Sequence, residues 1–254
     1  MLNIRNNRIL ILDFGSQYTQ LIARRIREIG VYCELLPYDV SPHFIENFKP
    51  NGIILSGGPD AVSQSDSARA PNIVFELDVP ILGICYGMQT MAIQLGGDAR
   101  SAEKAEFGFA QIRARNHSKL LKDINDEINS EGHGLLDVWM SHGIEVTKLP
   151  KDFELIASTD NCPIAGFAKH EKNYFGLQFH PEVTHTKQGI KIIERFVTTI
   201  CKCEKNWITE NIIDSLLKQI KTQVGNKKVL LGLSGGVDSS VVAILLHQAI
   251  GEKL

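Results

Sequence analysis

The fold is decided by the stretch Ile81-Leu82-Gly83-Ile84-Cys85-Tyr86-Gly87-Met88-Gln89. Its apolar beginning predicts a buried strand, the glycines around the cysteine predict a sharp turn, and the run from Met88 to Leu95 predicts a helix. The pattern Gly-x-Cys-x-Gly is the cysteine counterpart of the serine nucleophile elbow. The free N–H groups at the start of the helix would favour a thiolate at Cys85. Because a lone cysteine is more often a buried packing residue, the rest of the chain must decide between the two interpretations.

The composition is that of an ordinary soluble globular protein. The chain has 254 residues, of which 43% are hydrophobic and 22% charged, and its formal net charge is -2. This charge gives no reason to expect nucleic acid or an acidic membrane surface as a partner. No apolar run is long enough to cross a bilayer, and the N-terminus leads directly into a core-like strand, so we expect neither a membrane span nor a secretory leader.

The cysteines indicate a reducing compartment. They number five and form no Cys-x-x-Cys pair, and the Cys201-x-Cys203 spacing does not fit a zinc site. We therefore expect a cytoplasmic protein with reduced thiols and no metal held by protein ligands alone. Packing is the expected role of Cys201 and Cys203.

Strand-like and helix-like segments alternate from Arg8 to Leu95. The strand-like segments are continuous apolar runs, which is typical of parallel strands covered on both faces. We therefore predict a doubly wound, flavodoxin-like α/β fold with a mostly parallel sheet, whose sites lie at the carboxyl ends of the strands. The expected strands are 8–15, 31–36, 52–56 and 81–84, and the expected helices are 17–29, 44–48 and 88–95.

The middle of the chain predicts antiparallel strands inserted beside the parallel sheet. Residues 107–112 and 135–143 have strand-like composition, and we expect the second segment to run into a polar turn at Ser141-His142-Gly143. His142 is a catalytic candidate, although a loop histidine more often makes binding or structural hydrogen bonds.

Two more predicted strands end in residues that could take part in catalysis. Ser56-Gly57-Gly58-Pro59 follows one predicted strand, and its paired glycines would let backbone N–H groups point into a cleft as an oxyanion hole requires. The alternative for this segment is a plain glycine turn. Tyr174 to His180 is strand-like, and His180 and Glu182 would share a face of an extended segment. With Cys85 they complete a candidate Cys–His–Glu triad, in which the carboxylate orients the imidazole.

A second domain is expected to begin after residue 204. Helices are predicted at 189–199 and 206–224, and the apolar run 227–233 predicts a new buried strand. The loop that follows has the composition of a phosphate cradle at a helix N-terminus, since it leads into an apolar helix at 241–250. It consists of Ser234, Gly235, Gly236, Val237, Asp238, Ser239 and Ser240. Because Asp238 would repel phosphate, we expect a cation such as Mg²⁺ between them.

These motifs resemble a known family. Gly83-x-Cys85-x-Gly87-x-Gln89 with His180-Pro181-Glu182 resembles the class I glutamine amidotransferases, and the 234–240 loop resembles the pyrophosphate loop of the N-type ATP pyrophosphatases. The glutamine-hydrolysing GMP synthase family joins the two in this order. Segments 13–18, 138–143 and 182–186 agree with that family, whereas Ile144 stands where the family usually has Asp. The domains implied are a glutaminase domain, 1–204, and the linker helix and first part of an ATP pyrophosphatase domain, 205–254.

The resemblance implies a ligase of purine nucleotide biosynthesis. Cys85, His180 and Glu182 would be catalytic, the N–H groups of Gly58 and Tyr86 would form the oxyanion hole, and Gln89, Ser141 and His142 would bind glutamine. ATP and Mg²⁺ would be the cofactors and XMP the acceptor of ammonia, in a cytoplasmic protein that is a homodimer at full length. We expect the second domain to be truncated, which would leave this chain with the glutaminase chemistry alone.

Other functions stay open from the residues. The triad would also suit the glutaminase of another pathway or a γ-glutamyl hydrolase, although the phosphate loop argues against both. From a different class, the chain would be a catalytically idle scaffold that binds glutamine or a synthetase subunit. Intact Cys85, His180 and Glu182 argue against that alternative.

Overall fold

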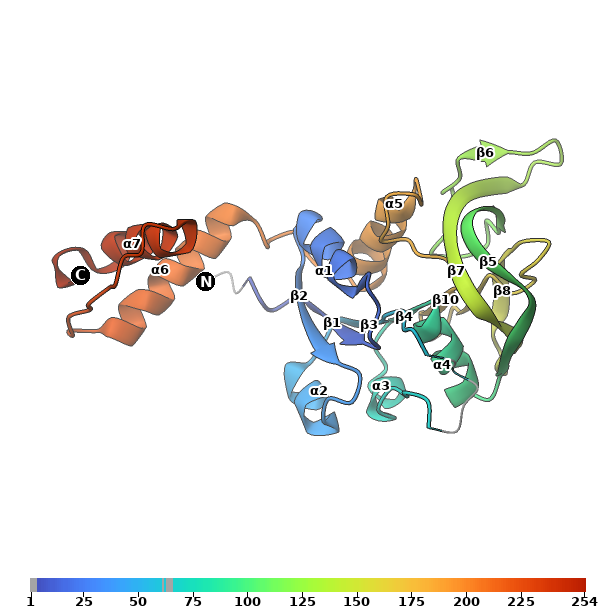
Figure 1. Cartoon of the computed structure of the whole chain (residues 1–254), viewed down its shortest axis with the longest axis horizontal. Coiled ribbons are helices and arrows are strands. Elements are labelled where there is room, and N and C mark those ends of the chain that lie inside the picture. Colours follow the sequence, from blue (N-terminus) through green and yellow to red (C-terminus); the bar gives the residue numbers. More distant parts are fainter. Residues whose placement is uncertain (1–3, 61, 63–65) are drawn as a thin grey trace. The chain divides into compact units, whose positions relative to one another are not determined.

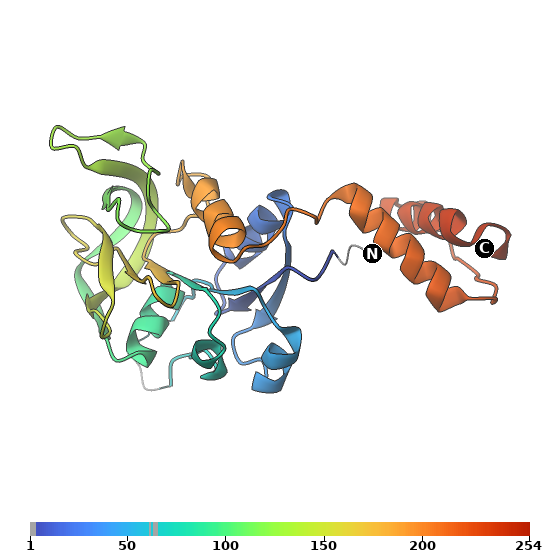
Figure 2. The same ribbon diagram turned by 180° about the vertical axis from the view of Figure 1, so that it is seen from behind.

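The chain forms two compact units. The structure is a computed structural model that describes residues 4–60, 62 and 66–254. One unit is Asn7–Glu204, and the other includes Lys205–Leu254. Figures 1 and 2 show the ribbon from its two sides.

The larger unit is built on one mixed sheet. Its parallel strands are β1 (Arg8–Asp13), β2 (Tyr32–Pro37), β3 (Gly52–Leu55), β4 (Ile81–Ile84) and β10 (Tyr174–Leu177). Its antiparallel part consists of β5 (Asp98–Ala114), β6 (Glu127–Ile128), β7 (Gly134–Lys148), β8 (Glu154–Ser158) and β9 (Gly166–Lys169). Within the described residues these ten strands run in the order β2-β1-β3-β4-β10-β9-β8-β5-β7-β6. The antiparallel strands predicted beside a parallel sheet are therefore confirmed.

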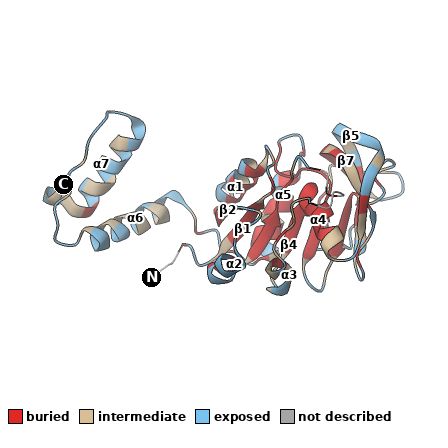
Figure 3. Ribbon diagram, turned by 60° about the horizontal axis from the view of Figure 1, so that its bottom comes forward, coloured by how far each residue is buried: buried red, intermediate tan, exposed pale blue. Residues whose placement is uncertain are grey.

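Helices cover both faces of the parallel part. On β1, Ile9 and Ile11 join one core and Leu10 and Leu12 join the other, because successive side chains of a strand point to opposite faces. Both cores are seen as buried ribbon in Figure 3. The predicted doubly wound α/β fold is therefore confirmed. The first core packs under α1 (Thr19–Glu28), α5 (Gly189–Glu194) and the π-helical turn Arg195–Ile200, and the second under α2 (Pro42–Phe48), α3 (Ile73–Glu76) and α4 (Tyr86–Gln94).

The predicted polar turn at residues 141–143 is wrong. Strand β7 continues through it to Lys148, and Ser141 and His142 pair with Phe107 and Glu106 of β5. Polar residues are tolerated in this strand because the antiparallel half need not be covered on both faces. His142 is consequently a strand residue, and a buried one.

The C-terminal unit is helical. Its elements are α6 (Thr209–Val224), α7 (Val237–Ile250) and a short 3-10 turn, Gly251–Lys253. The buried strand predicted at 227–233 is wrong, since these residues form no strand and Leu230 is 100% exposed. A parallel strand needs neighbours, and within Lys205–Leu254 none lies beside it. Over the described residues, no helix is long and apolar enough to span a membrane.

Candidate active site

Cys85 lies at the sharp turn between β4 and α4. Its backbone has φ 51° and ψ −108°, a left-handed conformation that a non-glycine residue seldom adopts. Two hydrogen bonds hold it there: the Cys85 N–H donates to the Leu177 carbonyl at 2.7 Å, and the Gln89 N–H donates to the Cys85 carbonyl at 3.1 Å. Strain of this kind costs about 1–3 kcal/mol and persists only where the surroundings fix it.

The two glycines of the elbow are required by packing. A Cβ on Gly87 would lie 2.1 Å from the carbonyl oxygen of Leu55 on β3. A Cβ on Gly83 would lie 2.7 Å from the backbone of Gly87. The start of α4 therefore rests directly on two strands, which places the Cys85 sulfur at the carboxyl edge of the sheet.

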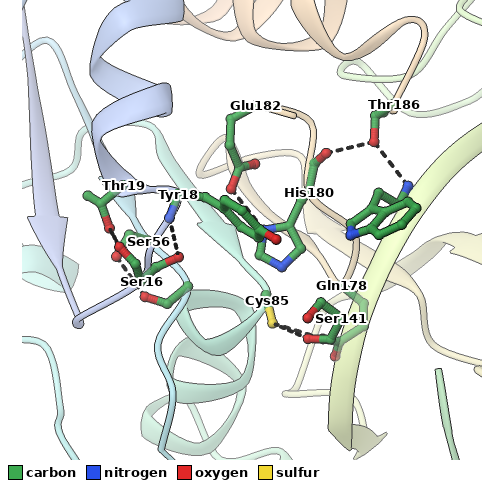
Figure 4. Close-up of polar contacts among 12 residues, drawn as sticks. Ser16, Tyr18, Thr19, Ser56, Cys85, Ser141, Gln178, His180, Glu182 and Thr186 are labelled. Atoms are coloured by element: carbon green, nitrogen blue, oxygen red, sulfur yellow. Dashed lines mark hydrogen bonds and ion pairs between the residues drawn. The ribbon is translucent and has the colours of Figure 1, made fainter. Parts of the chain in front are cut away.

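His180 and Glu182 form a buried pair beside this elbow. The His180 Nδ1–H donates to Glu182 Oε1 at 2.8 Å, and the carboxylate side chain is fully buried. The Tyr18 ring contacts the imidazole edge-on, with centroids 5.2 Å apart. Figure 4 shows the His180 ring between the Glu182 carboxylate and the Cys85 side chain. Strand β10 already ends at Leu177, so the pair sits in a turn rather than on the extended segment that we expected.

Hydrogen bonds from other elements fix the backbone of this turn. The His180 N–H donates to the Trp139 carbonyl on β7 at 3.0 Å, and the Thr186 hydroxyl donates to the His180 carbonyl at 2.6 Å. Arg25 of α1 donates to the Glu182 carbonyl at 3.1 Å. The backbone that carries His180 and Glu182 is thereby fixed by β7 and α1.

The electrostatics of the pair favour the imidazolium. Burial by itself lowers the pKa of His180, but the Glu182 carboxylate and contact with the Cys85 side chain outweigh it and raise the pKa to about 10. His180 is therefore protonated at neutral pH. An imidazolium can donate a proton to a leaving group and then accept one from water.

A cavity of about 380 Å³ opens at the cysteine. It brings together the six residues that we expected around glutamine, which are Gly58, Cys85, Tyr86, Gln89, Ser141 and His142. Pro59, Asp60, Phe107, Gly143 and Ile144 complete its lining. The lining of this cavity therefore combines segments that lie far apart in the sequence.

Gly58 and Tyr86, whose N–H groups are the expected oxyanion-hole donors, both line this cavity. Tyr86 is the first residue of α4, where a backbone N–H has no partner inside the helix. Gly58 lies so close to the backbone of Phe14 that a Cβ on it would be 2.8 Å from the Phe14 carbonyl oxygen. In the described part of the chain neither N–H donates to a protein carbonyl. This arrangement suits an oxyanion hole.

Gln89 and His142 are tied to protein partners. Gln89 Nε2 donates to the Ile144 carbonyl at 2.8 Å and to Gln178 Oε1 at 3.2 Å. The His142 ring nitrogens lie 3.1 Å from the Ile144 carbonyl and 3.3 Å from Glu106 Oε2. Glu106 and Gln178 were not expected from the sequence. A buried polar residue within an apolar run was the only signal for Gln178, and nothing marked Glu106.

Two groups of side chains have metal-ligand chemistry. Among the described residues, Glu106, His142 and Cys162, and separately His117, Glu154 and His170, place ligand atoms within 4.8 Å of one another. In the first group, burial and nearby carboxylates raise the pKa of the Cys162 thiol to about 12, so it stays protonated. Neither group overlaps the cysteine elbow.

The loop 234–240 lies in the other unit. Gly236 caps α7, and Val237 to Ser240 form the first turn of that helix. The Ser239 and Ser240 hydroxyls donate to the Gly236 carbonyl at 3.0 and 2.9 Å. The loop is largely exposed, and the N-terminus of a 14-residue helix with hydroxyls beside it fits a phosphate group.

Comparison with known proteins supports both units. Residues 10–200 match the family described as glutamine amidotransferase class-I, and residues 208–254 match the family described as NAD synthase. The chain is 69% identical over its whole length to the GMP synthase [glutamine-hydrolyzing] of Ruthia magnifica subsp. Calyptogena magnifica, and 58% identical over 252 residues to that of Cronobacter sakazakii. It spans about half of these relatives, 48% of each.

Solved structures agree with the fold. A Thermoplasma acidophilum protein provisionally described as one of the subunits of a GMP synthase superposes with a TM-score of 0.68 at 30% identity, covering 77% of this chain and 94% of that one. A glutamine amidotransferase from Thermotoga maritima superposes with a TM-score of 0.54 at 18% identity, covering 97% and 91%, and supports the fold alone. The elbow, the cavity and these matches together show that the chain belongs to the class I glutamine amidotransferase family.

Proposed function

We propose that this chain is the glutaminase portion of a glutamine-hydrolysing GMP synthase. The observation that carries the proposal is the strained Cys85 elbow, open to a cavity and adjacent to the buried His180–Glu182 pair. A serine- or cysteine-type acyl transfer needs a nucleophile, an oriented base and donors for the oxyanion, and the chain has a residue for each role.

In the first half-reaction the Cys85 thiolate attacks the side-chain amide carbon of glutamine. A bond forms between sulfur and carbon, and the carbonyl oxygen becomes an oxyanion that accepts hydrogen bonds from the N–H groups of Gly58 and Tyr86. The His180 imidazolium protonates the amide nitrogen, the carbon–nitrogen bond breaks, and ammonia leaves. Glu182 orients His180 throughout.

In the second half-reaction water hydrolyses the thioester. Neutral His180 takes a proton from water, whose oxygen attacks the thioester carbon through a second oxyanion. The carbon–sulfur bond then breaks, glutamate leaves, and Cys85 returns to the thiolate beside an imidazolium. The loss of one oxyanion-hole donor typically costs about 10²–10³ in rate.

Gln89, Ser141 and His142 of the cavity lining would make further contacts with glutamine. Both N–H bonds of Gln89 are occupied, so its Oε1 is the atom that would accept a hydrogen bond from the glutamine ammonium group. Both ring nitrogens of His142 already have protein partners, so His142 would contact glutamine by packing rather than by a hydrogen bond. Ser141 lies beside them on β7 and would contact the substrate through its own polar groups.

The second unit extends the proposal to the whole enzyme. We place the domain boundary between residues 204 and 205, which agrees with the division into compact units and with the separate family matches. The 234–240 loop would hold the phosphates of ATP with Mg²⁺ near Asp238, and ammonia would aminate XMP that ATP has activated. The full-length enzyme would be a cytoplasmic homodimer that binds neither nucleic acid nor membrane.

Glutamine hydrolysis and covalent labelling test the glutaminase assignment. We expect glutamate release by the wild-type chain, stoichiometric labelling of Cys85 by diazo-oxo-norleucine, and loss of both in Cys85→Ala. Cys33→Ala is the matched control, because Cys33 is a buried packing residue whose thiol pKa burial raises to about 11. If wild type shows neither activity nor label, even with a synthetase half added, the scaffold alternative replaces the enzyme.

A further inference from the structure

We infer that Gln178 is an additional catalytic residue, whose side-chain amide N–H donates to the Cys85 sulfur and favours the thiolate. The inference rests on the proposed role of Cys85 as nucleophile. Gln178 Nε2 lies 3.6 Å from Cys85 Sγ, and the Gln178 side chain has no solvent exposure. Figure 4 shows the two side chains facing each other.

The orientation of the Gln178 amide is dictated by Gln89. Gln89 Nε2 is a donor only, and it points one N–H at the Ile144 carbonyl and the other at the Gln178 side chain. The atom of Gln178 that faces Gln89 must therefore be its oxygen. This leaves the Gln178 NH₂ group directed at the sulfur.

The Gln89 amide is in turn fixed by a series of largely buried polar groups. The Ile144 carbonyl that fixes Gln89 also accepts from His142, which in turn pairs with Glu106 at 3.3 Å. Thr159 and Asn161 donate to the other oxygen of Glu106 at 3.4 and 3.3 Å. A continuous series of hydrogen bonds therefore runs from Glu106 to the nucleophile.

Besides His180, the sulfur has one neighbour that accepts a hydrogen bond and one that donates. The Cys85 thiol can donate to the Ser141 carbonyl at 3.5 Å, a contact available only to the protonated form. The Gln178 N–H can serve the thiolate as a charge-assisted donor, which is the stronger kind of hydrogen bond. Gln178 therefore supplies a compensating donor when the proton leaves the sulfur.

Alkylation of Cys85 by iodoacetamide tests the inference without glutamine. The thiolate displaces iodide and forms a sulfur–carbon bond, and the modified peptide is followed by mass spectrometry. We expect Gln178→Met, which keeps length and volume but removes the N–H, to slow alkylation at pH 7 about tenfold. Gln111→Met, the same change at an exposed position on β5, should leave the rate unchanged.

The pH dependence separates donation from packing. Loss of a thiolate donor moves the midpoint of the rate–pH curve upward, whereas a packing defect lowers the rate by one factor at every pH. The titratable groups around Cys85 are the same in both proteins: His180 with its partner Glu182, and Asp60, Tyr86 and His142 in the cavity lining. A Gln178→Met protein with an unchanged midpoint overturns the inference.

The outcomes distinguish this inference from the proposed function. If wild-type Cys85 reacts no faster than the cysteines of the unfolded chain, the proposed nucleophile itself fails. If wild type reacts rapidly and folded Gln178→Met reacts equally fast, only the role of Gln178 fails. Should Gln178→Met not unfold cooperatively, Gln89→Met frees the Gln178 amide to turn, and a wild-type rate in that variant also overturns the inference.

Discussion

Cys85 lines the cavity because neighbouring residues hold its backbone in a strained conformation. The positive φ of this residue is held by hydrogen bonds to Leu177 and Gln89, and Gly87 lets the helix approach β3. The chemistry of the site therefore depends on residues that never touch a substrate.

The charge state of His180 can be tested through stability. Its pKa rises from an ordinary value of 6.5 to about 10, so the imidazolium stabilises the fold fully below pH 6.5, and this contribution is lost as pH rises towards 10. Glu182→Gln removes the carboxylate charge that offsets the effect of burial on the pKa of His180. The pKa of His180 should therefore fall in this variant, as NMR titration would show. The stability advantage of wild type over this variant should shrink between pH 6.5 and 10, by at most about 1.4 kcal/mol per pH unit. A constant difference would contradict the assignment.

Gly87 tests the close packing of the elbow. Gly87→Ala places a Cβ against the Leu55 carbonyl, and we expect a loss of about 3 kcal/mol in unfolding free energy, together with slower alkylation of Cys85. The control is Gly143→Ala on β7, where the nearest atom to the new Cβ is 4.0 Å away. Equal denaturation midpoints for the two variants would refute the packing argument.

The helices and strands that could be predicted are those whose own residues mark them, through an apolar run or a glycine turn. The unit β4–Cys85–α4 could be predicted because apolar residues and glycines mark its strand and turn. The course of β7 through Ser141 could not, since its polar residues pair with a distant strand. The strand predicted at 227–233 failed for the opposite reason, because an apolar run forms no strand without neighbours. Gln178 could not be recognised because its side-chain hydrogen-bond partners, Gln89 of α4 and Cys85 of the elbow, are distant in the sequence.

The contact between β3 and the end of the π-helical turn offers a double-mutant test. A Cβ on Gly52 would lie 2.3 Å from Cys201 Sγ, whereas the Cys201 Cβ is 3.4 Å away. Gly52→Ala should therefore destabilise the fold, and adding Cys201→Ala should recover part of the loss. We expect a coupling energy of about 0.5–3 kcal/mol from urea denaturation of the four proteins. Strict additivity would show that the two positions do not meet.

At the level of the whole molecule, the two units differ in how much of their surface is covered. Asn7–Glu204 buries two continuous apolar cores, whereas α7 of the other unit exposes Val241, Val242 and Ile244. A helix that is apolar all round normally lies inside a larger domain. Local stability should therefore be lower in the C-terminal unit.

Limited proteolysis checks this difference. Lys227 and Lys228 are exposed and precede Leu230 in a segment without regular structure. Trypsin should cut first at one of them and leave the Asn7–Glu204 unit intact, as intact-mass spectrometry would show. A first cut between residues 7 and 204 would contradict the expectation.

The alternation of Ile9 and Ile11 with Leu10 and Leu12 on β1 has a consequence for how the strands find their partners. If β1 slipped by one residue against its neighbours, isoleucines and leucines of equal size would exchange faces. Burial of polar side chains therefore does not disfavour the misaligned pairing, as it does in a sheet that has one solvent-exposed face. Rejection must come from strand positions where a side chain has no room, above all Gly52 of β3 and Gly83 of β4. In this protein the smallest residues, rather than the most hydrophobic ones, enforce correct strand alignment.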